Sequence, residues 1–151
     1  MIDFLKKAFS ATGENLPADN DDIRTRDARL AVCALFLEMA NIDEEFSEEE
    51  QGTILSLLRE EFDLPDEYIT QFVAAAEEER RNSLDLWKFT DRINRNFDAE
   101  EKIRVVELLW RIVFSDGKLD KHEDYLVRKI SRLLNLRHSQ LIEAKLRVLN
   151  S

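Results

Sequence analysis

The sequence predicts a single all-α domain, a compact bundle of about seven helices with two pseudo-symmetric helix-turn-helix halves. The chain of 151 residues has only three Gly and two Pro, which favours long helices over turn-rich β folds. Apolar residues recur at helical spacing along most of the chain. A pattern of acidic and apolar residues that begins at Asp43 returns 73 residues later, at Asp116, which predicts the two related halves.

The domain is expected to span residues 23–150, after an N-terminal stretch of different character, residues 1–22. Within that stretch, Met1 to Phe9 is short and amphipathic, whereas Ser10 to Asp22 is polar and without an apolar period, as is typical of a linker. One or two amphipathic turns with two lysines bind a bilayer weakly, so docking onto the domain is the favoured use of residues 1–9.

Three helices are expected in the first half of the domain. The first runs from about Asp22 to Ile42 and the second from about Glu48 to Phe62. Pro65 suits the first turn of the third, which ends in the charged run Glu77 to Arg81. Their inward-facing residues are Ile23, Leu30, Cys33, Ala34 and Leu37, then Ile54, Leu57, Leu58 and Phe62, then Tyr68, Ile69, Phe72, Val73 and Ala76.

Four further helices are expected in the second half. One carries Leu86, Phe89, Ile93 and Phe97 and stops near Asp98, which with Glu101 reads as a capping box for the next. That next helix is the most apolar in the chain, so it is expected to form the core. Its apolar residues are Ile103, Val105, Val106, Leu108, Leu109, Trp110, Ile112 and Val113, and the last two helices carry Leu126, Ile130, Leu133 and Leu134, then Ile142, Leu146 and Leu149.

The net charge of −10 is unevenly distributed along the chain. Residues 1–82 hold 8 basic and 21 acidic side chains, against 14 and 11 in the remainder. This arrangement argues against nucleic-acid binding, which needs a concentrated basic face. It favours attraction between the halves, or a basic protein partner for the first half.

No apolar run is long enough to span a membrane, and no signal peptide is evident, so a cytoplasmic protein is expected. A membrane-associated partner, with a position peripheral to the inner membrane face, and self-association remain open. The single cysteine, Cys33, lies in an apolar run and is expected to be buried instead of redox-active. Trp87 and Trp110 are likewise expected in the core, because both sit at helical spacing.

The repeat aligns Arg29 to Leu58 with Lys102 to Ser131 without a gap. In each copy a hydrophobic helix ends at an Asp, an apolar residue follows three positions later, and a capping residue begins a new helix with Glu three further on. An architectural interpretation accounts for all of these residues, with Ser47–Glu50 and Asp120–Glu123 as capping boxes and Gly117 in the left-handed position that ends a helix.

A sharper interpretation concerns metal binding. Asp116 to Glu123 matches the last eight positions of an EF-hand calcium loop. However, Ile112 and Phe114 stand where that loop needs oxygen ligands, so a complete EF-hand is not expected. If the two copies meet, they would form an acidic binding cluster of Asp43, Glu50, Asp116, Gly117, Asp120 and Glu123. Within it, Asp43, Glu50, Asp116 and Glu123 would hold a divalent cation such as calcium weakly, or grip a basic partner.

No catalytic residues are predicted, and the chain is not expected to be an enzyme. A di-iron bundle needs a Glu-x-x-His pair on each of two helices, and neither His122 nor His138 completes one. No Gly-rich phosphate loop, nucleophile elbow or cysteine cluster occurs. A carboxylate-rich metal-dependent enzyme and a purely structural adaptor remain as alternatives to a binding module.

At these motifs the chain resembles the tellurite-resistance TerB family and related TerB-like domains, including the N-terminal domain of a membrane-anchored J-domain cochaperone. The resemblance covers Ile23 to about Asn150 and rests on the acidic motifs, on Trp87 to Asn94, and on Val106 to Gly117. It implies a helical bundle of two halves with an acidic surface, acting as a non-enzymatic component linked to tellurite and stress resistance, or as a co-chaperone-type adaptor. It also implies candidate functional acids, which carry over to Asp116, Gly117 and Glu123; the first copy departs from the pattern, with Glu44 in place of Gly.

Overall fold

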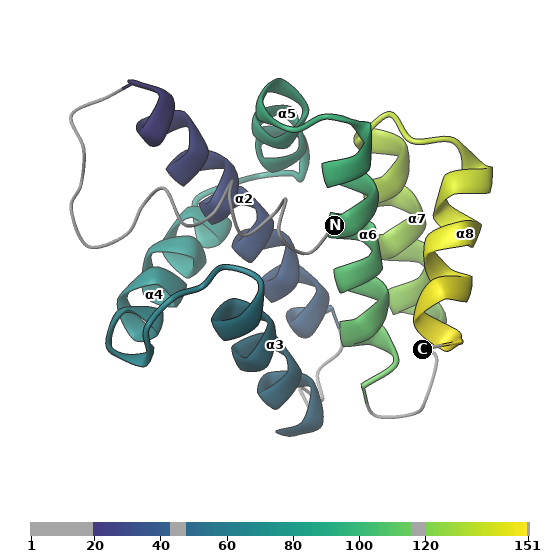
Figure 1. Cartoon of the computed structure of the whole chain (residues 1–151), viewed down its shortest axis with the longest axis horizontal. Helices are drawn as coiled ribbons and strands as arrows, with labels where there is room; N and C mark the ends of the chain where they lie inside the picture. Colours follow the sequence, from purple (N-terminus) through teal and green to yellow (C-terminus); the bar gives the residue numbers. More distant parts are fainter. Residues whose placement is uncertain (1–19, 43–47, 116–119, 151) are drawn as a thin grey trace.

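The computed structural model describes residues 20–42, 48–115 and 120–150, with the backbone only for residues 20–25 and 48–50. These residues form seven helices and, within the same ranges, no strand, which confirms the all-α prediction (Figure 1). The helices are α2 (Asn20–Asn41), α3 (Glu48–Glu60), α4 (Asp66–Arg81), α5 (Trp87–Asn96), α6 (Ala99–Val113), α7 (Lys121–Leu133) and α8 (His138–Leu149). The first of them begins three residues ahead of the domain boundary expected at residue 23.

Helix α2 lies at the centre of the bundle. It contacts α3, α4, α5, α6 and α7, and in Figure 1 it runs between α4 on one side and α5 and α6 on the other. The ten consecutive residues from Ala28 to Leu37 are all buried, so this helix is enclosed around its whole circumference. Such burial is possible because small residues, among them Ala31, Cys33 and Ala34, let neighbouring helices approach closely.

Helix α6 is the second central element and confirms the expectation that the most apolar segment forms the core. It contacts α2, α3, α7 and α8. Its start is fixed by the predicted capping box, in which Asp98 accepts from the Glu101 amide and Glu101 accepts from the Asp98 amide, each at 2.9 Å. The indole of Trp110 is fully buried and donates to the Leu141 carbonyl at 3.3 Å, which ties α6 to α8.

The repeat is visible in the helix bounds and in the pattern of burial. Helix α3 (Glu48–Glu60), shifted by 73 residues, coincides with α7 (Lys121–Leu133) at both ends. Buried positions correspond as well, as in Ile54 with Val127 and Leu57 with Ile130. Helices α2 with α3 and α6 with α7 are therefore equivalent pairs, with α4 and α5 between them along the chain and α8 after them.

A chain of ion pairs with buried carboxylates joins α6 and α8 to the residue that follows α3. The Arg104 guanidinium on α6 binds the carboxylate of Glu61, just beyond α3, and that of Glu107 at 2.8 Å. Arg147 on α8 reaches the same Glu107 at 3.0 Å. The side chains of Glu61 and Glu107 are only 2% and 5% exposed, so each depends on its arginine for compensation of its charge.

Ion pairs also cross the boundary between the acidic and the basic part of the sequence, which lies after Asn82. Glu61 to Arg104 is one such pair, and Arg92 to Glu79, at 2.7 Å, is another. Attraction between the two parts, expected from their opposite net charges, is therefore present in specific contacts.

Arg29 is a buried cation that the sequence pattern does not reveal. It is 1% exposed, donates to the Phe62 carbonyl at 3.0 Å, and lies 5.6 Å from the ring centres of both Phe62 and Phe72. Burial lowers the pKa of this arginine to about 9, although the negative charge of Asp63 acts in the opposite direction and raises the pKa. The ring faces and the carbonyl supply the favourable contacts that keep a guanidinium in the core.

The prediction for Cys33 is confirmed, because its thiol is fully buried. Burial raises the pKa of the thiol well above its ordinary value, with the negative charge of Glu77 as a second cause. A thiolate is therefore disfavoured at neutral pH, and the residue serves packing.

Replacing Arg104 with Ala should lower the free energy of unfolding by about 3 kcal/mol or more, because it removes the cation shared by the buried Glu61 and Glu107 and leaves Glu61 only the longer contact with Arg111, at 4.0 Å. Arg59→Ala is the matched control. Its pair with Asp66 is 2.7 Å long but mostly exposed, so less than about 1 kcal/mol should be lost. Urea unfolding followed by circular dichroism measures both variants. Equal losses would contradict a structural role for the buried chain of ion pairs.

Candidate functional site

The two acidic motifs are flanked by residues that come together at one edge of the bundle. Ile42 follows α2, immediately before the first motif, whereas Lys121, His122 and Tyr125 belong to the first turns of α7, at the end of the second. These four residues line one pocket of about 470 Å³. The ends of α2 and α6 both point to this edge, the lower one in Figure 1.

The structure describes only part of the predicted acidic cluster. Asp43, Asp116 and Gly117 lie outside the described residues, as does Ser47 of the first capping box. Glu50 is in the first turn of α3, where the structure describes the backbone alone. Of the predicted cluster, the structure describes the side chains of Asp120 and Glu123.

Asp120 is the N-cap of α7, as predicted, but its carboxylate bonds to the His122 amide, where the expected capping box has the Glu123 amide. Its backbone is extended, with φ −85° and ψ 135°, and its carboxylate accepts from the His122 amide at 2.8 Å. The imidazole of His122 is exposed, with Nδ1 3.9 Å from the Asp120 carboxylate. Asp120 thus has an architectural function as the cap of α7.

Glu123 is in the first turn of α7 and is only 3% exposed. A carboxylate in this position is favoured by the positive end of the helix dipole. Its neighbour Asp124 accepts from Arg128 Nε at 2.8 Å, one turn further along the same helix. The start of α7 thus holds three carboxylates over one and a half turns, those of Asp120, Glu123 and Asp124.

Within the described ranges, no group of three or more His, Cys, Asp or Glu side chains is placed to hold a metal ion. Of the four ligands predicted for a cation, only Glu123 has a described side chain. A cation site at this edge therefore stays a prediction, and its first-copy ligands are Asp43 and Glu50.

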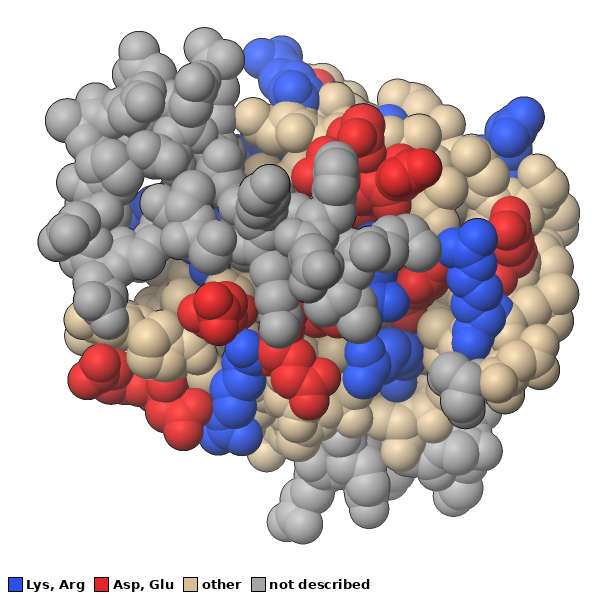
Figure 2. All heavy atoms as spheres, in the orientation of Figure 1, with Lys and Arg blue, Asp and Glu red and all other residues tan. Residues whose placement is uncertain are grey.

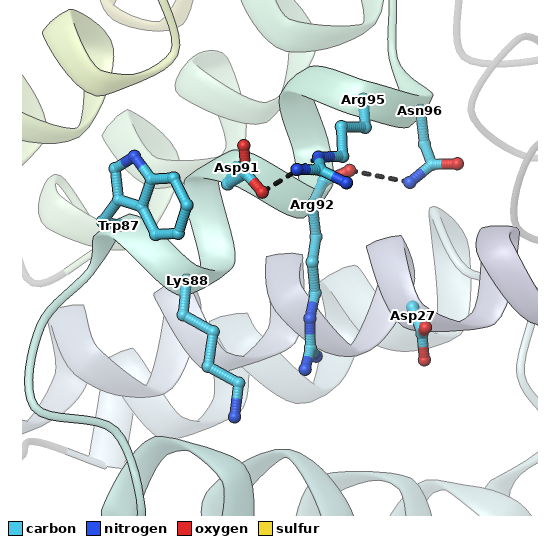
Figure 3. A pocket seen from close by; sticks show the side chains of 7 residues that line it. All are labelled: Asp27, Trp87, Lys88, Asp91, Arg92, Arg95 and Asn96. Carbon is cyan, nitrogen blue, oxygen red and sulfur yellow. Dashed lines mark hydrogen bonds and ion pairs between the residues drawn. The ribbon is translucent and has the colours of Figure 1, made fainter.

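A second pocket, of about 630 Å³, lies along the outer face of α5 (Figure 3). It is lined by Trp87, Lys88, Asp91, Arg92, Arg95 and Asn96 of α5 and by Asp27 of α2. Two of its cations are held by carboxylates, Arg95 by Asp91 at 3.0 Å and Arg92 by Glu79 of α4 at 2.7 Å. In Figure 3, Arg95 folds back along its own helix, whereas Lys88 and Arg92 extend together to one side.

The prediction that both tryptophans lie in the core is wrong for Trp87. Trp110 is fully buried, but Trp87 is 60% exposed at the mouth of the α5 pocket. The physical reason is that α5 is short and buries one face through Phe89, Thr90 and Ile93, and Trp87 lies off that face. The signal in the sequence was the neighbouring cations, Lys88, Arg92 and Arg95, which mark the outer face of the same helix.

On the face shown in Figure 2, acidic and basic side chains are interspersed over the described residues, and they form no continuous basic surface there. Among the helices that the structure describes, none is long and apolar enough to cross a membrane.

Comparison with known proteins finds one family. The model of the family described as tellurite resistance protein TerB matches residues 29–146, which is most of the chain. The match begins at the buried Arg29 and ends in α8, so it takes in both copies of the repeat. Neither a curated protein nor a solved structure matches the chain.

The different surroundings of the two tryptophans give a direct check of the α5 pocket. Trp87→Phe should remove the emission that acrylamide quenches, and leave the blue-shifted, poorly quenched emission of the buried Trp110. Fluorescence quenching on the native protein measures this, with Trp110→Phe as the converse variant. Equal quenching of the two single-tryptophan proteins would contradict the exposure of Trp87.

Proposed function

We propose, from the premise that this chain belongs to the TerB family of tellurite resistance proteins, that it is a non-enzymatic binding module. Its two acidic motifs, residues 43–50 and 116–123, act in this proposal as one binding surface. We call this surface the acidic edge. The family's link to tellurite resistance gives the setting, and the acidic edge gives the molecular contact.

One observation carries the proposal. Ile42, next to the first motif, and Lys121, His122 and Tyr125, at the end of the second, line a single pocket. Each motif is only a few residues long. Because Ile42 lies close to Lys121 and His122, we expect one ligand to reach both motifs. The coincidence of α3 and α7 under the 73-residue shift supports the same pairing.

The ligand proposed for the acidic edge is a divalent cation such as calcium, held weakly by Asp43, Glu50, Asp116 and Glu123. Carboxylate oxygens are the ligands that calcium prefers, and it takes six to eight of them. Four carboxylates supply part of that shell and water the rest, which is why the affinity is expected to be low. Asp120 adds negative charge from its position as the cap of α7.

A basic protein segment is the second candidate ligand for the same surface. The excess of acidic residues in positions 1–82 favours it, since 21 acidic residues there face only 8 basic ones. In this form the protein would work in the cytoplasm as a co-chaperone-type adaptor or scaffold, at the inner membrane face if its partner is membrane-associated.

Titration with calcium, magnesium and zinc, followed by amide chemical shifts, tests the proposal. Saturable shifts are expected at residues 42–50 and 116–125, with one common dissociation constant, because the two motifs share the ion. Asp43→Asn and Asp116→Asn should each abolish the shifts in both motifs. Glu100→Gln is the matched control, an exposed acid in the first turn of α6 outside the motifs, and it should leave the affinity unchanged.

Three other outcomes would each lead elsewhere. Shifts confined to one motif would reject the shared surface. The absence of shifts at millimolar metal would reject cation binding and leave the basic partner. Tight binding of a redox-active metal would favour the alternative hypothesis, that the protein is a carboxylate-rich metal-dependent enzyme.

A further inference from the structure

A third pocket lies between α7 and α8, and its charged lining residues are basic. It has a volume of about 250 Å³ and is lined by Tyr125, Arg128, Ser131 and Arg132 of α7, Leu136 of the turn, and His138 and Leu141 of α8. The chain as a whole carries a net charge of −10, yet among the described residues that line this pocket there is no carboxylate. We name it the α7–α8 pocket.

The turn between the two helices builds this pocket. Helix α7 ends in a Schellman motif, in which the Leu136 amide donates to the Ser131 carbonyl at 3.1 Å and the Asn135 amide to the Arg132 carbonyl at 3.0 Å. Asn135 takes the left-handed conformation that this motif needs, with φ 63°. The chain therefore reverses within four residues, and α8 starts beside the last turns of α7.

Arg128 has its donors arranged for an anion. Its Nε donates to Asp124 at 2.8 Å, which fixes the direction of the guanidinium. No other hydrogen bond of this side chain involves the described residues, and Arg128 lines the pocket, so its two terminal nitrogens are available to a ligand there. A guanidinium held in this way presents the fork that phosphate oxygens accept bidentately.

Three further groups complete the set of donors. Arg132 lies one turn along α7 from Arg128 and has no ion pair within the described part of the chain. Ser131 lies between them, is only 2% exposed, and lines the same pocket. His138 is the first residue of α8, whose twelve residues bring the positive end of a helix dipole to the same place.

The size of the pocket restricts the ligand. Sites for drug-sized molecules measure about 300–1,000 Å³, so 250 Å³ suits one compact group. The ring of Tyr125, which is 60% exposed, stands at the same pocket and offers a face to whatever the compact group is attached to.

From this geometry we infer that the α7–α8 pocket binds the phosphate group of a small organic phosphate monoester. Arg128, Arg132 and Ser131 hold the phosphate oxygens, and His138 at the start of α8 adds to the positive potential. Tyr125 packs against the organic part of the ligand. Tyr125 also lines the pocket at the acidic edge, but none of the proposed cation ligands lines the α7–α8 pocket, so the inference does not rest on cation binding.

Titration of the intact protein with inorganic phosphate and with phenyl phosphate, followed by amide chemical shifts, tests the inference. Saturable shifts should cluster at residues 128–141, with phenyl phosphate the tighter of the two probes. Arg132→Gln should raise both dissociation constants about tenfold or more, because a charge-assisted contact to the phosphate is lost. Tyr125→Ala should raise only that of phenyl phosphate.

Lys129→Gln is the matched control. It removes the same charge from an exposed position on the same helix, and Lys129 does not line the pocket. Its dissociation constants should stay within twofold of the unmodified protein. An equal weakening by Lys129→Gln and Arg132→Gln would reduce the effect to general charge attraction and overturn the inference, as would an absence of saturable shifts at tens of millimolar phosphate. The amide spectrum reports in the same experiment that each variant is folded.

Discussion

The buried contact between Glu61, Arg104 and Glu107 is the constraint on which the arrangement of this bundle depends. A carboxylate that is 2% exposed must meet a cation, and the cation available to Glu61 is on α6. This requirement fixes the end of α3 against α6, and Glu107 with Arg147 extends it to α8. Buried ion pairs add little net stability compared with apolar packing, but the loss of one partner is costly, so they select one arrangement over its alternatives.

The position of the acidic edge follows from this arrangement. Helices α3 and α6 are held together, and α2 is enclosed by its neighbouring helices. The C-terminal ends of α2 and α6 therefore lie at one edge of the bundle. The same packing brings Ile42 to the first turns of α7. The packing of apolar helices thus places Ile42, which precedes the first motif, beside Lys121 and His122 of the second, and the proposed pairing of the two motifs rests on this contact.

The sequence pattern predicts the helices, but it does not predict which charged residues are buried or which aromatic residue is exposed. Spacing predicted the bounds of α3 to within two residues, and it predicted a helix through Leu126, Ile130 and Leu133, where α7 lies. Arg29 and Glu61 could not be found in this way, since a charged residue in a helical pattern is normally assigned to the solvated face. Their burial depends on partners distant in sequence, Phe72 for Arg29 and Arg104 for Glu61, and only the packed structure brings those partners together. Trp87 is the opposite case, an aromatic residue left outside because α5 has a single buried face.

The α7–α8 pocket also depends on features that spacing does not show, because a left-handed Asn135 and a four-residue reversal bring Arg132 beside His138. The central claim, however, concerns the acidic edge as one surface formed by both motifs. Paramagnetic broadening by manganese tests it most directly, with the ion added in small steps to the native protein. If both motifs form one surface, the amides of Ile42, Lys121 and His122 lose intensity together, at the same manganese concentration. Broadening on one side alone, or at two separate concentrations, would contradict it.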